Sequence, residues 1–501
     1  MLFNSYIFIL FFFPITLLGY FTLNKYAYGK KGMAGILWLF LMSLWFYGYE
    51  KPIYLVLILS SIAVNYLVSK LIYWMKKHNK PHQRTIMWLG VFANLAVLFY
   101  FKYMNFFFDS IKGIYDFHWH KEIALPLGIS FFTFQQVSYI ADCYRSKEGI
   151  NYNFFEYAAY VTFFPQLVAG PIVMHSELVP QLQDRSKKTI NYENMSRGLY
   201  AFALGLSKKV LLADSLSRVV TAGFADISSL NSMTAVLVMI AYTLQIYFDF
   251  SGYSDMAIGM GLMFNVELPV NFDSPYKAYS IGDFWTRWHK TLNRFFIQYV
   301  YIPLGGSRKG KLRTYLNTVI IFLLSGIWHG ANWTYIMWGV THGILLVIEK
   351  GFGELNLGVK NVTERTKKFI HAFRVAVTFI IVNPTMVLFR SESIPKAWEY
   401  MERIFSGGSE VAKPLTDIVN DMIEIRILGR IGLNGFIEQY PAIPFIVVLV
   451  ILLIGVFFLR NTQEKVKQEA YDWKRTIVTV GLMVWCMVSL SDVSEFLYFN
   501  F

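Results

Sequence analysis

Long runs of apolar residues are the feature that most constrains how this chain of 501 residues can fold. A helix that crosses the hydrocarbon core of a bilayer needs about 20 mostly apolar residues. Clear runs of this kind lie at roughly 3–23, 33–49, 52–69, 85–108, 313–329, 333–349, 369–389, 442–459 and 476–490. Less regular apolar stretches lie near 123–142, 154–173, 196–213 and 233–263. The sequence therefore predicts an all-α polytopic membrane protein, with residues 1–501 as a single membrane domain of about 11–13 transmembrane or re-entrant helices.

The composition agrees with a membrane protein. Hydrophobic residues make up 55% of the chain and charged residues only 16%, whereas soluble domains are about 25% charged. This excludes a disordered chain and disfavours an ordinary soluble enzyme. The two cysteines, Cys143 and Cys486, are too few for a disulfide framework, and we expect buried thiols.

The net charge of +13 indicates topology rather than nucleic-acid binding, because cytoplasmic loops of membrane proteins are enriched in Lys and Arg. Of the 46 basic residues, 26 fall in five segments, at 25–31, 70–84, 287–313, 350–374 and 460–475. Placing these segments in the cytoplasm puts the N-terminus and Phe501 outside. No basic residue precedes Lys25, and we expect a retained first helix rather than a signal peptide.

The C-terminal part divides in two under this topology. The 390–440 segment is predicted to be a non-cytoplasmic loop, because it holds eight Asp and Glu against six Lys and Arg. Within it, Ile394 to Phe405 has the spacing of a short amphipathic helix. Residues 441–501 are predicted to form C-terminal transmembrane helices.

Between Tyr242 and His342, polar residues are concentrated within apolar sequence, and polar groups at membrane depth are functional candidates. Asp249 and Asp255 lie in a long apolar segment that is interrupted by Ser251 and a glycine. These acids are interpreted as a structural pair in a kinked helix, a cation site, or a substrate contact, and the sequence leaves the choice open.

Two basic segments follow. Residues 283–299 have an apolar face at helical spacing, typical of a helix at the membrane interface, and His289 stands at the boundary of that face. A boundary histidine is either structural or functional. The next segment, 301–311, is Gly-rich and basic, and it is either a cytoplasmic turn or a phosphate cradle without Walker spacing.

His329 is the strongest candidate for chemistry. It ends an apolar run between Trp328 and Gly330, and Asn332 nearby is a candidate for fixing its tautomer. A neutral imidazole in this setting can accept a proton as a general base. His342, one helix later, is interpreted as structural. The chain has no His-Glu-x-x-His motif, Cys–His cluster or dinucleotide fingerprint, so neither a metal site nor a bound cofactor is expected.

Several of these segments together form a known pattern. The sequence resembles the membrane-bound O-acyltransferase (MBOAT) family, in particular its alginate O-acetyltransferase (AlgI-like) branch. The matching segments are Pro126–Gln135, Phe164–Pro171, Tyr247–Asp255, Phe284–His289, Tyr299–Gly306 and Trp328–Gly330, together with the terminal Phe496–Phe501. The resemblance implies a catalytic core at 95–350 and a ring of helices around a central funnel or tunnel.

The resemblance also implies roles for individual residues. His329 matches the catalytic histidine of the family, and His289 matches its second signature position. We expect His289 to orient the acceptor or polarise the thioester carbonyl. The residues expected to line the tunnel or contact substrate are Trp285, Trp328, Asn332, Asp249, Ser251 and Tyr253. Arg308, Lys309 and Lys311 are expected to meet phosphates of the acyl donor.

The expected function is O-acetyl transfer in a bacterial inner or plasma membrane. A cytoplasmic acyl thioester, such as acetyl-CoA, would supply the acetyl group for an alginate-like or other cell-surface polysaccharide. Transfer is either direct or through an extracytoplasmic SGNH-type partner. Two alternatives stay open at this point: D-alanyl transfer to teichoic acid from a carrier protein, and an ion-coupled transporter that uses Asp249 and Asp255.

Overall fold

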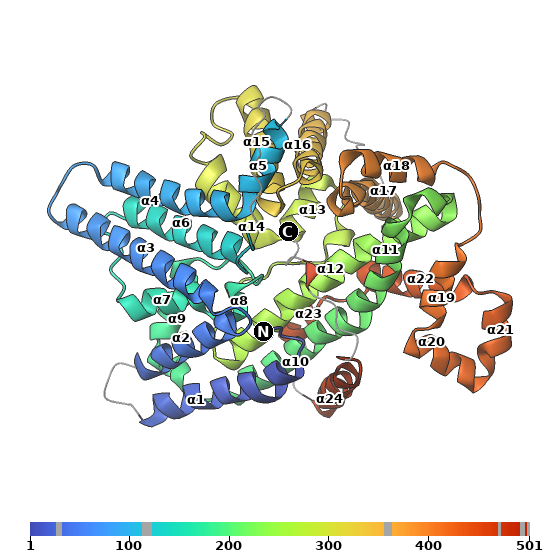
Figure 1. Ribbon diagram of the computed structural model, residues 1–501, viewed down its shortest axis with the longest axis horizontal. Coiled ribbons are helices and arrows are strands. Elements are labelled where there is room, and N and C mark those ends of the chain that lie inside the picture. Colours follow the sequence, from blue (N-terminus) through green and yellow to red (C-terminus); the bar gives the residue numbers. More distant parts are fainter. Residues whose placement is uncertain (27–32, 113–122, 355–362, 469–471, 491–495, 498–501) are drawn as a thin grey trace.

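The computed structural model describes residues 1–26, 33–112, 123–354, 363–468, 472–490 and 496–497, and every regular element in these ranges is a helix (Figure 1). The predicted all-α class is confirmed. The N-terminal half contains α1 (Phe13–Tyr26), α2 (Met33–Gly48), α3 (Ile53–Lys77), α4 (Gln83–Leu98), α5 (Met104–Ile111), α6 (Ile129–Arg145), α7 (Phe154–Thr162), α8 (Phe164–Leu167), α9 (His175–Gln183), α10 (Tyr192–Ser207), α11 (Asp214–Ala225) and α12 (Ser232–Met263).

The C-terminal half follows the same pattern of long helices and short connecting ones. It contains α13 (Ile281–Arg287), α14 (Lys290–Phe296), α15 (Lys311–His329), α16 (Trp333–Glu354), α17 (Glu364–Arg390), α18 (Ile394–Ile404), α19 (Lys413–Asn420), α20 (Ile423–Leu428), α21 (Asn434–Gln439), α22 (Ile443–Phe458), α23 (Thr462–Gln468) and α24 (Trp473–Val488). Helix α18 lies where the sequence predicts an amphipathic helix.

Five helices of the described residues are long and apolar enough to cross a membrane, and six if the bent pair 424–439 and 443–458 counts as one span. The five are Phe8–Tyr26, Ile53–Lys77, Gln83–Ile111, Ser232–Met263 and Glu364–Arg390. Fewer helices pass this test than the 11–13 predicted segments. Helices α15 and α16, with 19 and 22 residues, are long enough but less apolar, whereas several other apolar stretches form shorter or broken helices. The stretch 154–173, for example, contains α7 and the four-residue α8, with Pro165 at the start of α8.

Helix α12 lies at the centre of the bundle (Figure 1). In its apolar stretch of 18 residues, 83% of the residues are buried inside the protein. Glycines allow α10 to approach it closely. A Cβ added to Gly198 would lie 2.5 Å from the Gly259 carbonyl oxygen, and one added to Gly205 would lie 2.6 Å from that of Gly252. Small residues at seven-residue spacing on both helices therefore place the two backbones in direct contact, as in other membrane helix pairs.

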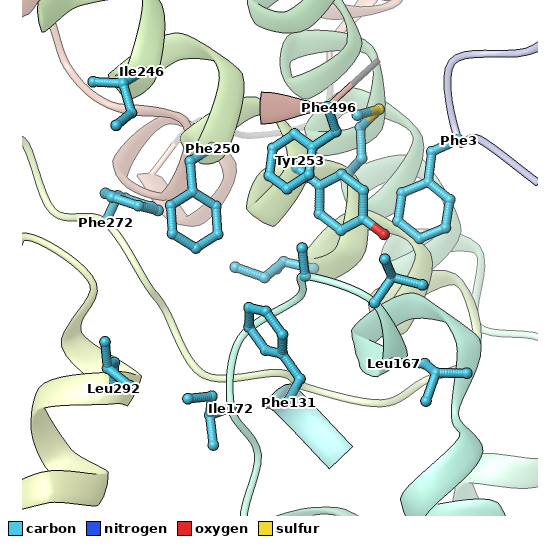
Figure 2. Packing of buried hydrophobic residues seen from close by; sticks show 14 of the residues in the cluster. Phe3, Phe131, Leu167, Ile172, Ile246, Phe250, Tyr253, Phe272, Leu292 and Phe496 are labelled. Atoms are coloured by element: carbon cyan, nitrogen blue, oxygen red, sulfur yellow. The ribbon is translucent and has the colours of Figure 1, made fainter. Parts of the chain in front are cut away.

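A three-ring stack joins α12 to segments from both ends of the chain. The ring of Tyr253 lies between Phe3 and Phe496, with centroid distances of 4.6 Å to each (Figure 2). Beside this stack, the Leu497 backbone N–H donates to an Asp249 carboxylate oxygen at 3.0 Å. Residues 496 and 497 are therefore part of the central core.

Helices α15 and α16 form a tightly packed hairpin. A Cβ at Gly326 would lie 2.3 Å from the Tyr335 carbonyl oxygen, and a Cβ at Gly339 would lie 2.3 Å from that of Phe322. Only glycine permits this separation. The hairpin fixes the position of the last residue of α15, which is His329.

Candidate active site

His329 is buried in an aromatic setting at the end of α15, with 2% of its surface exposed. Its ring centroid lies 5.2 Å from those of both Trp338 and Phe389, and 5.0 Å from that of Trp328. The following residue must be small, because a Cβ at Gly330 would lie 2.2 Å from the ring of Tyr335. The WHG segment therefore places an imidazole among aromatic rings, where bulk water is excluded.

His289 lies between α13 and α14 and is completely buried. Its backbone adopts φ 47° and ψ 48°, a left-handed conformation that non-glycine residues rarely adopt and that costs about 1–3 kcal/mol. The structure brings its ring to 6.2 Å from that of His329, centroid to centroid. Two histidines that are 40 positions apart in the sequence thus lie side by side.

Asn271 determines which nitrogen of His289 carries the proton. Its Oδ1 lies 3.1 Å from His289 Nδ1 and also accepts the Thr291 backbone N–H at 3.4 Å and the Thr291 hydroxyl at 2.9 Å. Since Oδ1 is an acceptor in these contacts, Nδ1 must donate. The neutral His289 ring then carries its lone pair on Nε2.

A small cavity of about 50 Å³ opens beside His329. Its wall is lined by Lys102, Leu125, Pro126, Leu127, Gly128, Ile129, Ser130, Phe131, Val168, Trp328 and His329. Gly128, with φ +69°, makes the turn into α6, and a Cβ there would lie 2.7 Å from the Leu167 carbonyl oxygen. The two sequence segments Pro126–Gln135 and Phe164–Pro171 therefore meet at this cavity.

Of the two tryptophans predicted to line the tunnel, Trp328 lines the cavity beside His329 and Trp285 contacts His342. Trp328 lines the cavity, and its buried indole N–H has no hydrogen-bond partner among the described residues. Trp285 donates to His342 Nδ1 at 3.3 Å, and His342 Nε2 lies 3.0 Å from the Thr385 hydroxyl. Both ring nitrogens of His342 are thus occupied within the protein, in agreement with its structural interpretation.

The two acids of α12 are paired with lysines. Lys209 contacts Asp249 at 2.7 Å and Asp214 at 2.8 Å, and Lys208 contacts Asp255 at 2.6 Å. These lysines begin the π-helical turn Lys208–Ala213, which follows α10. Of the three interpretations left open by the sequence, this geometry favours a structural role for Asp249 and Asp255.

Of three further residues predicted at the tunnel, two lie in α12 and one lies between α15 and α16. Ser251 is buried within α12, and Tyr253 belongs to the stack with Phe3 and Phe496. The Asn332 amide donates to the Glu392 carbonyl at 2.8 Å and accepts the Thr334 N–H at 3.0 Å. A substrate role for these residues stays a prediction.

Arg308, Lys309 and Lys311 lie on an exposed turn and at the start of α15. This position is open to a charged ligand, but donor binding here stays a prediction. Within the described ranges, no group of three or more His, Cys, Asp or Glu residues could hold a metal ion.

Lys102, Ser130 and Asn271 are site residues that the sequence reasoning missed. Lys102 lies in the π-helical turn Phe99–Tyr103, between α4 and α5, and a lysine inside an apolar span was the available signal. Asn271 lies in a short polar segment after α12 and gave no comparable signal.

Comparison with known protein families gives a match over the part of the chain that contains these site residues. The sequence model of the MBOAT, membrane-bound O-acyltransferase family, matches residues 79–388. The chain belongs to the MBOAT family. This match includes the whole predicted core at 95–350 as well as His289 and His329. As an MBOAT protein, it is an acyltransferase and a multi-pass membrane protein.

Relatives of this MBOAT protein carry several names. It is 37% identical to the peptidoglycan O-acetyltransferase of Helicobacter pylori, over 100% of this chain and 98% of the relative. It is also 37% identical to the probable alginate O-acetylase AlgI of Pseudomonas aeruginosa, over 82% of this chain and 76% of the relative. The teichoic acid D-alanyltransferase of Bacillus subtilis is 27% identical over 46% of this chain and 60% of the relative.

Proposed function

We propose that this protein is an O-acetyltransferase that moves an acetyl group from a cytoplasmic acyl thioester, such as acetyl-CoA, to a hydroxyl of an extracytoplasmic glycan. The observation that carries the proposal is the pairing of two buried imidazoles, His289 and His329, with ring centroids 6.2 Å apart beside a cavity. Similarity to relatives named for O-acetyl transfer supports the choice of acyl group.

In this proposal His329 acts as the general base. It takes the proton of the acceptor hydroxyl while the hydroxyl oxygen bonds to the thioester carbon, and the carbonyl electrons move to oxygen. When the tetrahedral intermediate collapses, the C–S bond breaks and the proton on His329 passes to the thiolate sulfur. General-base assistance of this kind contributes about 10²–10⁴-fold to a rate.

His289 would orient the acceptor. Because Asn271 Oδ1 accepts a hydrogen bond from Nδ1–H, the Nε2 lone pair suits a second hydroxyl of the acceptor glycan better than a thioester carbonyl, which has no hydrogen to donate. Of the two roles expected for this residue, the geometry therefore favours orientation of the acceptor over polarisation of the carbonyl.

The test uses membranes that contain the full chain, with [14C]acetyl-CoA as donor and label in the polymer fraction as readout. We expect His329→Ala to lower transfer about 10²-fold or more, because it removes the base. His78→Ala, a change at an exposed histidine, is the control. If His329→Ala keeps the normal rate at normal expression, the proposal is wrong.

The acceptor is tested in the same cells. Full-length similarity to a peptidoglycan O-acetyltransferase makes peptidoglycan a candidate beside a secreted alginate-like polysaccharide. Acetate released from digested muropeptides and from secreted polymer, measured with and without His329→Ala, identifies the acceptor. Acetylated product that forms only when an SGNH-type enzyme is present would indicate a relay through that partner.

The two alternatives make different predictions. D-alanyl transfer requires label from D-[14C]alanine, and its support is similarity over about half of the chain. The transporter reading requires acids available to a coupling ion, yet Asp249 and Asp255 contact lysines at 2.7 and 2.6 Å. These ion pairs favour the transferase.

Orientation completes the proposal. We place the protein in the bacterial inner or plasma membrane, with both termini outside and the basic turn at Arg308 in the cytoplasm, where it would meet donor phosphates. Reaction of single introduced cysteines with an impermeant maleimide on intact cells tests this. Labelling of Arg308→Cys from outside would contradict the orientation.

A further inference from the structure

Lys102 reaches the end of α15 from a different helix. Its Nζ donates to the Trp328 carbonyl at 2.6 Å, the His329 carbonyl at 3.2 Å and the Ser130 hydroxyl oxygen at 3.3 Å. The neighbouring Tyr103 hydroxyl donates to the Ile327 carbonyl at 2.8 Å. Three consecutive carbonyls at the end of α15 are therefore held by one turn.

Helix geometry explains why a cation fits here. The last carbonyls of a helix have no partner within it, and they form the negative end of the helix dipole. Lys102 donates to two of these carbonyls, those of Trp328 and of His329, the candidate base. It does so from the π-helical turn Phe99–Tyr103, and such turns within α-helices are frequent at functional sites.

Lys102 differs in its surroundings from the two lysines after α10. Among the described residues no carboxylate lies within ion-pair distance of Nζ, in contrast to Lys208 and Lys209. Lys102 is half-buried, and a cation inside an apolar span that lacks a carboxylate partner is costly and marks a functional candidate. Lys102 also lines the cavity beside His329.

We propose that Lys102 is a positioning residue for acyl transfer, acting through His329 and through Ser130. This rests on the proposed role of His329 as base. The Ser130 oxygen accepts from Lys102, so the hydroxyl hydrogen points away from Lys102, and Ser130 lines the same cavity. Its hydroxyl would donate to the thioester carbonyl oxygen as negative charge develops there.

The ammonium contributes to this step without touching the substrate. A hydroxyl whose oxygen accepts from a cation is a stronger donor, because hydrogen bonds in a chain polarise one another. No bond to Lys102 or Ser130 forms or breaks, and neither residue gives up a proton. The substrate bonds change as described for the base mechanism.

The experiment measures the rate of [14C]acetyl transfer in membranes against acetyl-CoA concentration. We expect Lys102→Met to lower kcat about 30-fold or more with KM changed less than about threefold, because a developing charge is stabilised only in the transition state. Lys102→Arg keeps the cation and should restore part of kcat. Ser130→Ala should lower kcat about 5- to 30-fold.

Lys76→Met is the matched control. Lys76 also donates to a backbone carbonyl, that of Ser146 at 2.6 Å, and its Nζ lies 5.7 Å from the ring of Tyr144. Lys102 has the same two contacts with Trp328, at 2.6 Å and 5.8 Å. Loss of one such contact away from the cavity should leave kcat within about twofold.

The double variant Lys102→Met/Ser130→Ala separates positioning from a structural role. If Lys102 acts through Ser130, the double variant should transfer no more slowly than Lys102→Met alone, since effects of residues that act as a unit are not additive. A further loss equal to that of Ser130→Ala alone would overturn the proposal. So would a normal kcat for both Lys102→Met and Ser130→Ala.

Failure of the proposed function looks different. In that case His329→Ala itself keeps the parent rate, whatever Lys102→Met does. Thermal unfolding in detergent checks each variant, and Ser130→Ala, which removes one oxygen, carries the test if Lys102→Met does not fold. A normal rate in a folded Ser130→Ala would then overturn the role of its hydroxyl and with it the proposal.

Discussion

Replacing Asn271 with leucine tests whether the orientation of His289 matters for transfer. Leucine is close to asparagine in size but cannot accept a hydrogen bond. The change removes the acceptor of His289 Nδ1–H, of the Thr291 hydroxyl and of the Thr291 N–H, all in a region that is completely buried. The fold keeps its shape while the imidazole loses the partner that sets its tautomer.

The size of the effect follows from the contacts. A buried donor left without a partner costs about 1–3 kcal/mol. If that cost falls on the productive His289 orientation alone, transfer slows by about 5- to 150-fold, because 1.36 kcal/mol corresponds to a factor of ten. The three lost contacts also lower stability, which is measured separately by thermal unfolding in detergent.

Asn94→Leu is the control for this measurement. Asn94 and Asn65 exchange two hydrogen bonds, at 2.6 and 3.1 Å, between α3 and α4, so the change also removes buried amide contacts. Initial rates of [14C]acetyl transfer are compared per folded protein. A rate for Asn271→Leu within twofold of the parent, in folded protein, would refute the role assigned to His289.

Two further changes test the packing around α12. Lys209→Met leaves Asp249 and Asp214 as buried charges without their shared cation, and we expect a loss of about 3–5 kcal/mol in stability, read as a lower Tm in detergent; an unchanged Tm would contradict the pairing. Gly205→Leu places a side chain against the Gly252 carbonyl, only 2.6 Å from the first added carbon, and should abolish folded protein in size-exclusion chromatography; a normal elution profile would show that the two helices can separate.

The sequence indicated the helical class and the two histidines because both depend on local pattern. Apolar runs read directly as buried helices, and the family motifs around His289 and His329 are short and contiguous. The number of helices that cross the membrane was harder to predict from the sequence. Hydropathy cannot distinguish one continuous helix from the pair α7 and α8, which is broken near Pro165.

The supporting residues could not be assigned from local pattern. Lys102 contacts a carbonyl 226 positions away, and its role depends on how α15 ends against another helix. Asp249 was open to three interpretations because the sequence does not say that Lys209, in the π-helical turn after α10, contacts it. Such pairings arise from tertiary packing and have no periodicity to detect.

The stack of Phe3, Tyr253 and Phe496 has a consequence for the order of biosynthesis. Tyr253 precedes Phe496 by 243 residues, so α12 is made long before its second aromatic partner. At about 5–20 residues per second, roughly 12–50 s of synthesis separate the two. During that interval the central helix carries Asp249 without the Leu497 N–H. Until residues 496 and 497 are made, α12 therefore lacks one aromatic neighbour of Tyr253 and one hydrogen-bond donor to Asp249.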